Sequence, residues 1–288
     1  MSRIVYVNGR YVPYAEARVH VDDRGFLFAD GVYEVCEVRD GHIIDEERHL
    51  ARLARSLREL DMQAPMNGAC LQIVIAEVLR RNRVRDGLVY LQVTRGAARR
   101  DFLFPDPERV PPTLVVSAKI VSPAAGEQVA EAGISVITLP ENRWSRVDIK
   151  TTGLLPNVLA KMQAKAQGAR EAWFIDRDGF ITEGGSSNAW IVSKDDVLIT
   201  RPAEIGILRG VTRTTLFDVA RQEGLGIEER GFTLAEALAA KEAFITSATT
   251  IVTPVVQIDS TLIGTGRPGP LAQRLRKNFH SIAASRAI

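Results

Sequence analysis

Two short runs decide how this chain is organised: DIK at residues 148–150 and TEGGSSN at residues 182–188. Between them the sequence predicts a helix over 155–167, followed by a strand, a turn and a second strand. The two runs therefore place one lysine and one glutamate at the edges of predicted regular elements. The rest of the chain decides what chemistry such a pair can perform.

Composition places the chain among ordinary globular proteins. It has 288 residues, 45% of them hydrophobic and 25% charged, with a net charge of +2. This length accommodates one large or two medium domains. No basic run is interleaved with aromatic residues, which argues against a nucleic-acid partner. Cys36 and Cys70 do not form a disulfide framework, and the four histidines lack the spacing of metal ligands.

The N-terminal residues MSRIVYVNG lack the apolar core of a signal peptide. No apolar run approaches the length of about 18 residues that a membrane span requires. From these two observations we expect a cytoplasmic protein with no membrane partner.

The first part of the chain reads as antiparallel strands followed by helices. Asn8-Gly9 and Asp40-Gly41 each separate two β-type runs and predict hairpin turns. A leucine stripe predicts a helix over 45–60, because its members recur every three or four residues. Further apolar patterns predict a helix over 70–82 and strands over 88–94 and 113–118. The polar segment 95–112 between these strands is long enough to indicate a functional loop.

The segment 120–128 contains Ser-Pro-Ala-Ala-Gly and is predicted to link two domains, a small one over 1–119 and a larger one over 129–288. In the larger domain, Gly224 follows a predicted helix over 212–223 at the position of a C-terminal cap. The remaining predicted elements of this domain are strands over 134–139, 171–176, 180–182, 188–192, 197–199, 242–245 and 252–258, and helices over 234–240 and 271–284.

The chain lacks the P-loop, the Gly-x-Ser-x-Gly elbow and the His-Glu-x-x-His motif. What remains suits a phosphorylated aldehyde cofactor. Such a cofactor needs a lysine nucleophile, for which Lys150 is the candidate, and a carboxylate against its pyridine nitrogen, for which Glu183 is the candidate. It also needs a phosphate site, which Gly210-Val211-Thr212 before a helix would supply. Thr249 and Thr250 add hydroxyl groups after a strand.

Each of these residues also has a purely structural interpretation. Lys150 at a strand end is typical of a solvated surface residue, and Glu183 of a capping or salt-bridge residue. Thr212 would act as an N-cap that accepts a backbone N–H. Thr249 and Thr250 would simply fill a strand.

The joint pattern resembles the fold-type IV pyridoxal-phosphate enzymes, which include D-amino acid aminotransferases, branched-chain aminotransferases and aminodeoxychorismate lyase. The resemblance extends from residue 6 to residue 254 in order and spacing. Its motifs are YVNG at 6–9, FADGVYE at 28–34, HLARL at 49–53, TRG at 94–96, DIK at 148–150, TEG with SSN at 182–188, ILRGVTR at 207–213 and TP at 253–254.

The resemblance implies a fold and a role for each matching residue. The fold would be α/β (α+β), with a small α/β domain and a larger domain that has a β-barrel-like core. Lys150 would bind pyridoxal 5′-phosphate as a Schiff base and then move a proton, and Glu183 would pair with the pyridinium nitrogen. Implied phosphate ligands are Arg52, the Val211 and Thr212 amides and Thr249. Leu208 would pack under the ring, and Ser186 and Ser187 would lie in a shell around the cofactor.

The subfamily implied is that of the D-amino acid aminotransferases, because Thr-Thr-Gly-Leu-Leu-Pro-Asn follows Lys150 and Ser-Ser-Asn follows Glu183 and its two glycines. Tyr33, Arg100 and Thr250 would contact the substrate, with Arg100 on its carboxylate. Phe102 stands where that subfamily usually has a histidine. A branched-chain L-amino acid aminotransferase, an (R)-amine transaminase and an aminodeoxychorismate lyase therefore stay open. The resemblance also implies a homodimer.

Overall fold

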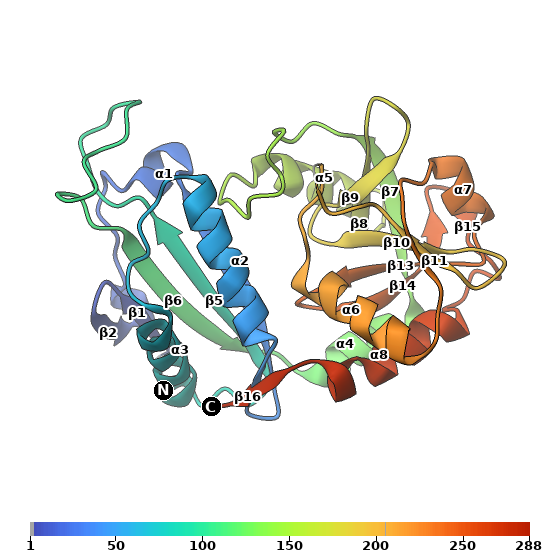
Figure 1. Ribbon diagram of the computed structural model, residues 1–288, viewed down its shortest axis with the longest axis horizontal. Helices are drawn as coiled ribbons and strands as arrows, with labels where there is room; N and C mark the ends of the chain where they lie inside the picture. The colour runs from blue at the N-terminus through green and yellow to red at the C-terminus, as the bar shows by residue number, and fades with distance from the viewer. Residues whose placement is uncertain (1–2, 205) are drawn as a thin grey trace. The chain divides into compact units, whose positions relative to one another are not determined.

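The computed structural model describes residues 3–204 and 206–288, and the chain divides into two compact units (Figure 1). The first unit contains the described residues up to Pro123, together with Ile149–Gly153 and Ala284–Ile288. The second unit contains Ala124–Asp148 and Leu154–Ala283. Among the described residues, no helix is long and apolar enough to cross a membrane.

The first unit is built on a seven-stranded antiparallel sheet with the order β16-β4-β3-β5-β6-β1-β2. The C-terminal strand thus completes one edge of a sheet made otherwise by the N-terminal part of the chain (Figure 1). The strands are β1 (Ile4–Val7), β2 (Arg10–Pro13), β3 (Gly31–Arg39), β4 (His42–Ile44), β5 (Gly87–Thr94), β6 (Thr113–Ile120) and β16 (Ser285–Ala287).

The two predicted hairpin turns are confirmed by their backbone angles. Asn8 and Gly9 have φ values of 43° and 89°, and Asp40 and Gly41 have values of 49° and 77°. Both residues of each turn are therefore left-handed, as a two-residue hairpin turn requires. These turns set the β1–β2 and β3–β4 registers.

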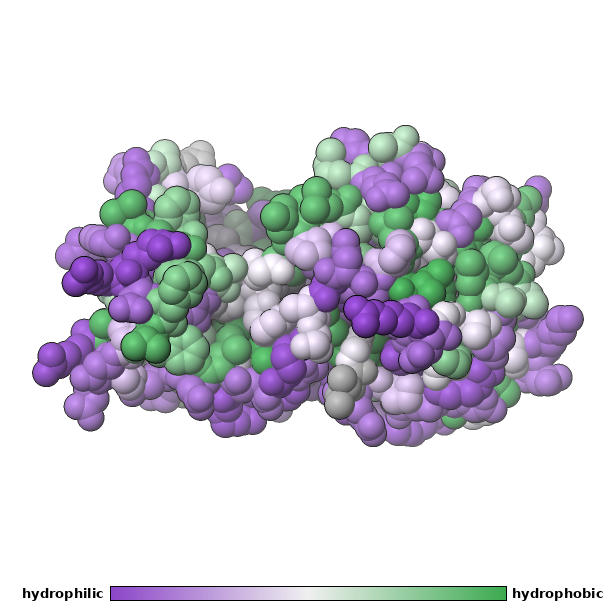
Figure 2. Space-filling model, turned by 90° about the horizontal axis from the view of Figure 1, so that it is seen from above, coloured by the Kyte–Doolittle hydropathy of each residue, from purple (hydrophilic) through white to green (hydrophobic). Residues whose placement is uncertain are grey.

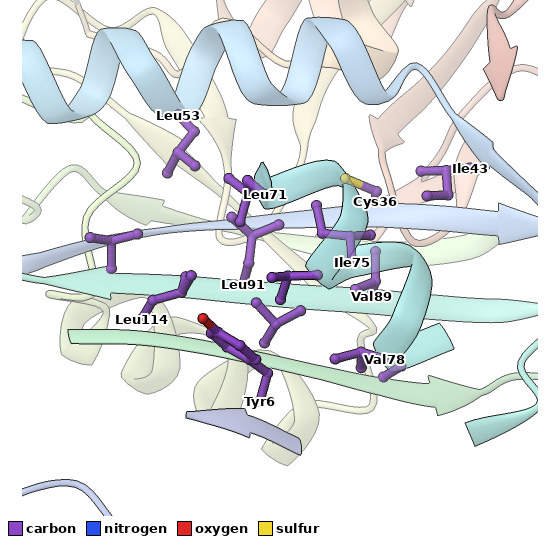
Figure 3. Close-up of a cluster of buried hydrophobic side chains, with 14 of the residues drawn as sticks. Tyr6, Cys36, Ile43, Leu53, Leu71, Ile75, Val78, Val89, Leu91 and Leu114 are labelled. Atoms are coloured by element: carbon purple, nitrogen blue, oxygen red, sulfur yellow. The ribbon is translucent and has the colours of Figure 1, made fainter. Parts of the chain in front are cut away.

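Two helices, α2 (Glu46–Glu59) and α3 (Gly68–Asn82), pack their apolar faces on this sheet. Figure 3 shows Leu53 of α2 and Leu71 and Ile75 of α3 gathered over Leu91 and Leu114 of the sheet. Burial of each such side chain contributes about 1.5–3 kcal/mol, so the leucine stripe read from the sequence stabilises the unit. Two short elements precede β3: η1 (Tyr14–Glu16) and α1 (Arg24–Phe28).

The second unit is built on a mixed nine-stranded sheet with the order β12-β11-β10-β13-β14-β7-β8-β9, and β15 also pairs with β14. The β7–β8, β7–β14 and β11–β12 pairs are parallel, and the other pairs are antiparallel. The strands are β7 (Ile134–Pro140), β8 (Glu171–Ile175), β9 (Ile181–Gly184), β10 (Asn188–Val192), β11 (Leu198–Thr200), β12 (Ile227–Glu229), β13 (Glu242–Ser247), β14 (Ile251–Ile258) and β15 (Thr261–Leu262).

Two helices of this unit, α6 and α8, pack against each other and against β13. Trp190 of β10 stacks on Phe244 of β13 with ring centroids 5.6 Å apart, and Phe217 of α6 closes the same cluster. This packing fixes the position of α6. The helices are α4 (Pro123–Ala132), α5 (Leu155–Ala166), α6 (Val211–Gln222), α7 (Leu234–Ala239) and α8 (Pro270–Ile282).

The segment 120–128, predicted as a linker, contains the last residue of β6 and the beginning of α4. Its alanines favour a helix more strongly than its proline opposes one, because proline is tolerated in the first turn. The domain bounds predicted from the sequence remain a proposal.

Candidate active site

The segment that carries Lys150 runs beside β3 in the first unit. Tyr33 N–H donates to the carbonyl of Lys150 at 3.0 Å, and Thr152 N–H donates to the carbonyl of Gly31 at 2.9 Å. Thr151 forms a bridge with Val32 between these two bonds. The backbone on both sides of Lys150 is therefore held, and its side chain begins from a defined position.

The Lys150 side chain lies against an aromatic pair. Its Nζ donates to Tyr33 Oη at 3.2 Å and lies 4.2 Å from the Tyr33 ring centroid. Tyr33 packs on Tyr90, whose hydroxyl donates to Gln92 Oε1 at 2.6 Å. Burial raises the pKa of Tyr90 to about 12, and Tyr33 adds to the rise, so Tyr90 stays protonated. Within residues 3–204 and 206–288, no carboxylate pairs with the Lys150 amine, which leaves it available as a nucleophile.

Arg52 of α2 is held by a buried carboxylate on β3. Its Nε and Nη2 donate to Glu34 Oε1 and Oε2, each at 2.7 Å, and His49 Nδ1 lies 2.7 Å from Oε2. Burial would raise the pKa of Glu34, but the charge and hydrogen bonds of Arg52, helped by His49, lower it to about 2. The ionised carboxylate thus orients Arg52, a side chain suited to binding a phosphate.

We expect Glu34→Gln to destabilise the protein by about 3 kcal/mol at pH 7, because it breaks a buried ion pair. The lowered folded-state pKa means that this stabilisation is present above about pH 4.5 and is lost as pH falls towards 2. Urea unfolding at pH 7 and pH 3 should therefore show the difference from wild type shrinking at the lower pH. The surface variant Glu108→Gln is the control. A difference that stays constant with pH would contradict this account.

Glu183 lies at the end of β9 in the second unit and is buried. Its Oε1 accepts from Arg143 Nη1 at 2.6 Å. Its Oε2 accepts from Asn188 Nδ2 at 2.9 Å and from Leu208 N–H at 3.0 Å. Burial raises the pKa of this carboxyl, while the charge and hydrogen bond of Arg143 oppose the rise. The carboxylate is therefore fixed in direction from both sides.

The first turn of α6 lies beside this carboxylate, because Asn188 also donates to the carbonyl of Leu208 at 2.9 Å. The N-cap is Gly210, and no side chain caps the helix. A Cβ at Gly210 would lie 2.1 Å from Asn188 Oδ1, so the close approach requires glycine. The interpretation of Thr212 as an N-cap is therefore wrong: Thr212 is buried within the first turn, as is Val211. The first-turn N–H groups have no partner inside the helix and are suited to an anion.

Thr249 and Thr250 lie in the turn between β13 and β14. The hydroxyl of Ser247 lies 3.2 Å from that of Thr249 and 2.9 Å from that of Thr250. The next residue, Ile251, has a φ of 58°, which is a strained value for a β-branched side chain. Strain of this kind persists only where the surrounding packing holds it, so the two hydroxyls have defined positions.

Arg100 lies in the loop between β5 and β6 and is exposed. Its guanidinium carbon lies 5.2 Å from the Phe28 ring centroid and 5.8 Å from that of Phe102. In the part of the chain that the structure describes, no carboxylate pairs with it. Two aromatic rings therefore position a cation whose charge remains unneutralised.

The base of this loop is anchored by the partly buried carboxylate of Asp30. Asp30 Oδ2 accepts from Arg24 Nε and from Arg95 Nε, each at 2.8 Å. Arg24 Nη1 also donates to the carbonyl of Asp101 at 2.7 Å. The backbone next to Arg100 is thus tied to the body of the unit.

Each unit carries residues of the types that pyridoxal phosphate requires. The first has a lysine amine held by a tyrosine hydroxyl, and the second has a buried carboxylate held on both oxygens and a helix that begins at a glycine. The family model described as "Amino-transferase class IV" matches residues 31–258. The chain belongs to this family. It is therefore a class IV aminotransferase, a pyridoxal-phosphate-dependent enzyme.

Relatives of this class IV aminotransferase include the D-alanine aminotransferase of Bacillus licheniformis, which is 40% identical over 94% of each chain. The branched-chain aminotransferase of Thermoproteus uzoniensis, solved with norvaline, has a TM-score of 0.85 at 26% identity and covers 97% of this chain and 94% of its own. A hypothetical aminotransferase from Mycobacterium tuberculosis, solved in its PLP-bound form, has a TM-score of 0.83 at 26% identity, with coverages of 97% and 98%. The predicted two-domain α/β fold of the fold-type IV enzymes is confirmed.

In this class IV aminotransferase, Ser186 and Ser187 form hydrogen bonds with a carboxylate other than that of Glu183. Both hydroxyls donate to Glu171 Oε2, at 2.9 Å and 3.1 Å. Glu171 is buried and also lies 3.1 Å from Lys161 Nζ. The two serines thus tie the loop after Glu183 to the start of β8.

Sequence reasoning missed the partners that orient the predicted residues, above all Arg143, Glu141, Asn188 and Glu34. Arg143 lies in the loop after β7, far along the chain from Glu183, and nothing in its local sequence distinguishes it from a surface arginine. Asn188 had a signal, because it ends the TEGGSSN run, but its two hydrogen bonds depend on the position of the loop before α6.

Proposed function

We propose that this enzyme transfers the amino group of a D-amino acid, such as D-alanine or D-glutamate, to a 2-oxo acid such as 2-oxoglutarate or pyruvate. The reaction would follow a ping-pong cycle, in which the 2-oxo acid formed from the first substrate leaves before the second substrate binds. The D-alanine aminotransferases that align along nearly the whole chain support this choice of substrate.

The observation that carries the proposal is the Lys150 amine, which donates to Tyr33 Oη at 3.2 Å and, among the described residues, forms no ion pair with a carboxylate. Bound pyridoxal phosphate supplies an electrophilic carbon for this amine and a ring that withdraws electrons. Lys150 would hold the cofactor and, once released, move a proton between the substrate α-carbon and the cofactor's C4′ carbon. Tyr33 would orient the amine through both steps.

The second unit would bind the ring and the phosphate. Glu183 would pair with the protonated ring nitrogen, and Leu208, whose N–H already bonds Glu183, would pack against the ring. The Val211 and Thr212 amides would bind the phosphate, together with the Thr249 hydroxyl. Arg52 of the first unit would add a positive charge to this dianion.

Arg100, Tyr33 and Thr250 would contact the substrate, with the Arg100 guanidinium on its carboxylate. Phe102 is 81% exposed, and its ring lies 5.8 Å from the Arg100 guanidinium carbon. A histidine at this position would offer hydrogen-bonding nitrogens, which phenylalanine lacks. Ser186 and Ser187 would not touch the cofactor. They would support the loop after Glu183 through their hydrogen bonds to Glu171.

We expect Arg100→Ala to raise the Michaelis constant for D-alanine about 10- to 100-fold, because a charge-assisted hydrogen bond contributes about 1.5–3 kcal/mol. The Michaelis constant for an (R)-amine without a carboxylate should change far less. Steady-state kinetics on both substrates measure the difference. Arg99→Ala is the matched control, since this neighbouring arginine is also exposed. Equal effects of Arg100→Ala on both substrates would show that Arg100 is not the carboxylate ligand.

The substrate class is tested by mixing the holoenzyme with D-alanine or L-leucine and following the cofactor absorbance. Loss of the absorbance of the aldehyde form with D-alanine supports the proposal, and loss with L-leucine alone would replace it with a branched-chain L-amino acid aminotransferase. The likeness to a solved branched-chain enzyme makes that the second candidate. Adding an (R)-amine identifies an (R)-amine transaminase. Pyruvate release from aminodeoxychorismate without an acceptor identifies the lyase.

We also propose that the enzyme is a homodimer. Four apolar residues of α5 recur at helical spacing and are exposed in the single chain: Leu155, Val158, Leu159 and Met162. Figure 2 shows apolar residues reaching the surface among polar ones on one face of the molecule. A stripe of this kind is typical of a subunit interface. Light scattering should give twice the chain mass, and a monomer would contradict the proposal.

The cytoplasmic location stays a prediction, which cell fractionation would test.

A further inference from the structure

Arg143 is a buried arginine that holds two carboxylates at once. Its Nε and Nη2 donate to the two oxygens of Glu141, at 2.8 Å and 2.6 Å, and its Nη1 donates to Glu183 Oε1 at 2.6 Å. The side chain is only 5% exposed, and its guanidinium carbon lies 4.6 Å from the Phe174 ring centroid. The guanidinium is therefore fixed in one orientation by bidentate pairing and by an aromatic face.

Glu141 is itself held in place. Thr182, the residue before Glu183, donates its hydroxyl to Glu141 Oε2 at 2.9 Å. Arg143 N–H also donates to Glu141 Oε1 at 3.0 Å. The three charged residues thus form one connected group on the loop after β7 and the end of β9.

The charges of this group do not cancel. It contains one guanidinium and two carboxylates, so one negative charge is left over when both carboxylates are ionised. Arg213 of α6 also interacts electrostatically with Glu183, and it is paired with Glu229 at 2.8 Å. The other two groups that donate hydrogen bonds to Glu183 within the described residues, the Asn188 amide and Leu208 N–H, are neutral. Among these partners, Arg143 is therefore the cation that contacts Glu183 directly.

We propose that Arg143 is a positioning residue for Glu183: it keeps this carboxylate ionised and aimed, so that the proton shared with the cofactor's ring nitrogen stays on the ring. The inference rests on the proposed function. Its physical basis is that a hydrogen bond from a cation stabilises the carboxylate relative to the carboxylic acid. Without Arg143, the buried Glu183 carboxylate would compete with the ring nitrogen for the proton. Arg143 stabilises the ionised carboxylate, so the proton stays on the ring.

The test is the protonation state of the ring nitrogen in the holoenzyme, read by NMR of pyridoxal phosphate labelled with ¹⁵N in the ring. We expect a pyridinium signal in the wild type. In Arg143→Gln the signal should move towards that of neutral pyridine, because the ratio of ring-bound to Glu183-bound proton falls about 10-fold or more. Arg143→Lys should restore the wild-type signal in part. A pyridinium signal that persists in Arg143→Gln would overturn the proposal.

Two further variants separate this role from simple support of the loop. Glu141→Gln removes the outer carboxylate but leaves Arg143 beside Glu183, so the ring should stay protonated. If Arg143 only supported the loop, Arg143→Gln and Glu141→Gln would both leave the ring signal unchanged. Arg201→Gln is the matched control, because Arg201 pairs with Asp176 at 2.6 Å in the same unit without contacting Glu183.

The wild-type spectrum keeps the two proposals apart. A wild-type protein that binds no pyridoxal phosphate would refute the proposed function itself. A wild-type enzyme that binds it and reacts with D-alanine, while Arg143→Gln keeps the pyridinium signal, would refute only the role of Arg143. If Arg143→Gln yields no folded holoenzyme, Arg143→Met decides, because it keeps much of the side-chain length without the charge: a pyridinium signal identical to wild type contradicts the proposal, and a shift towards neutral pyridine supports it.

Discussion

Replacing Lys150 with alanine should lower the turnover of D-alanine with 2-oxoglutarate by about 10⁴-fold or more, because both the cofactor's covalent partner and the base that moves the substrate proton are lost. Borohydride reduction should no longer attach the cofactor to the chain. The fold should be retained, since the carbonyl of residue 150 still accepts from Tyr33 N–H. Turnover measured with stoichiometric enzyme and mass spectrometry of the reduced protein provide the two measurements.

The control for this change is Lys165→Ala. Lys165 lies in the last turn of α5, is exposed and is one of the few other lysines in the same part of the chain. Its removal should leave turnover and the reducible bond intact. Full turnover in Lys150→Ala would overturn the assignment of Lys150.

The Glu183→Gln variant should have a turnover number about 10²-fold lower, because a neutral amide no longer stabilises the protonated ring. It should also lose about 1–3 kcal/mol of stability. Glu183 accepts three hydrogen bonds, from Arg143, Asn188 and Leu208, whereas an amide has a single acceptor oxygen. At least one donor is then left without its partner. Steady-state kinetics and thermal unfolding of the holoenzyme measure the two effects.

Glu228→Gln is the control for this second change. Glu228 pairs with Arg230 at the surface of the same unit, and its replacement should alter neither quantity. Unchanged kinetics in Glu183→Gln would remove the argument that this carboxylate stabilises the ring proton. Unchanged stability would show that its three hydrogen bonds are replaced without cost.

Local features of the sequence predicted those parts of the fold that depend on a few adjacent residues. Asn8-Gly9 and Asp40-Gly41 adopt the predicted turns because their left-handed backbone suits these residue types. In the leucine stripe of α2, Leu53 and Leu57 are buried and Leu50 is half-buried against the same core, because helical spacing places them on one face. The short helix α1 was missed: its N-cap, Asp23, accepts from Gly25 N–H, but a helix of five residues has too little periodicity to be recognised.

The site illustrates the same division. Lys150, Glu183 and Gly210 could be selected from the sequence, because cofactor chemistry demands those residue types beside particular elements. The N-cap role of Gly210 was missed, since Thr212 is the better capping residue by type. The decisive fact is that Asn188 lies too close to Gly210 for any side chain there, and this contact joins segments far apart in the chain.

For the runs at 148–150 and 182–188, the sequence by itself determined the functional groups, an amine and a carboxylate, and the elements that carry them. Only the tertiary structure decided their states. The Tyr33 hydroxyl accepts a hydrogen bond from the Lys150 amine, and Arg143 and Asn188 donate hydrogen bonds to the two oxygens of Glu183. The physical reason is that charge state and direction depend on burial and on partners brought from distant segments, which no local pattern of residues specifies.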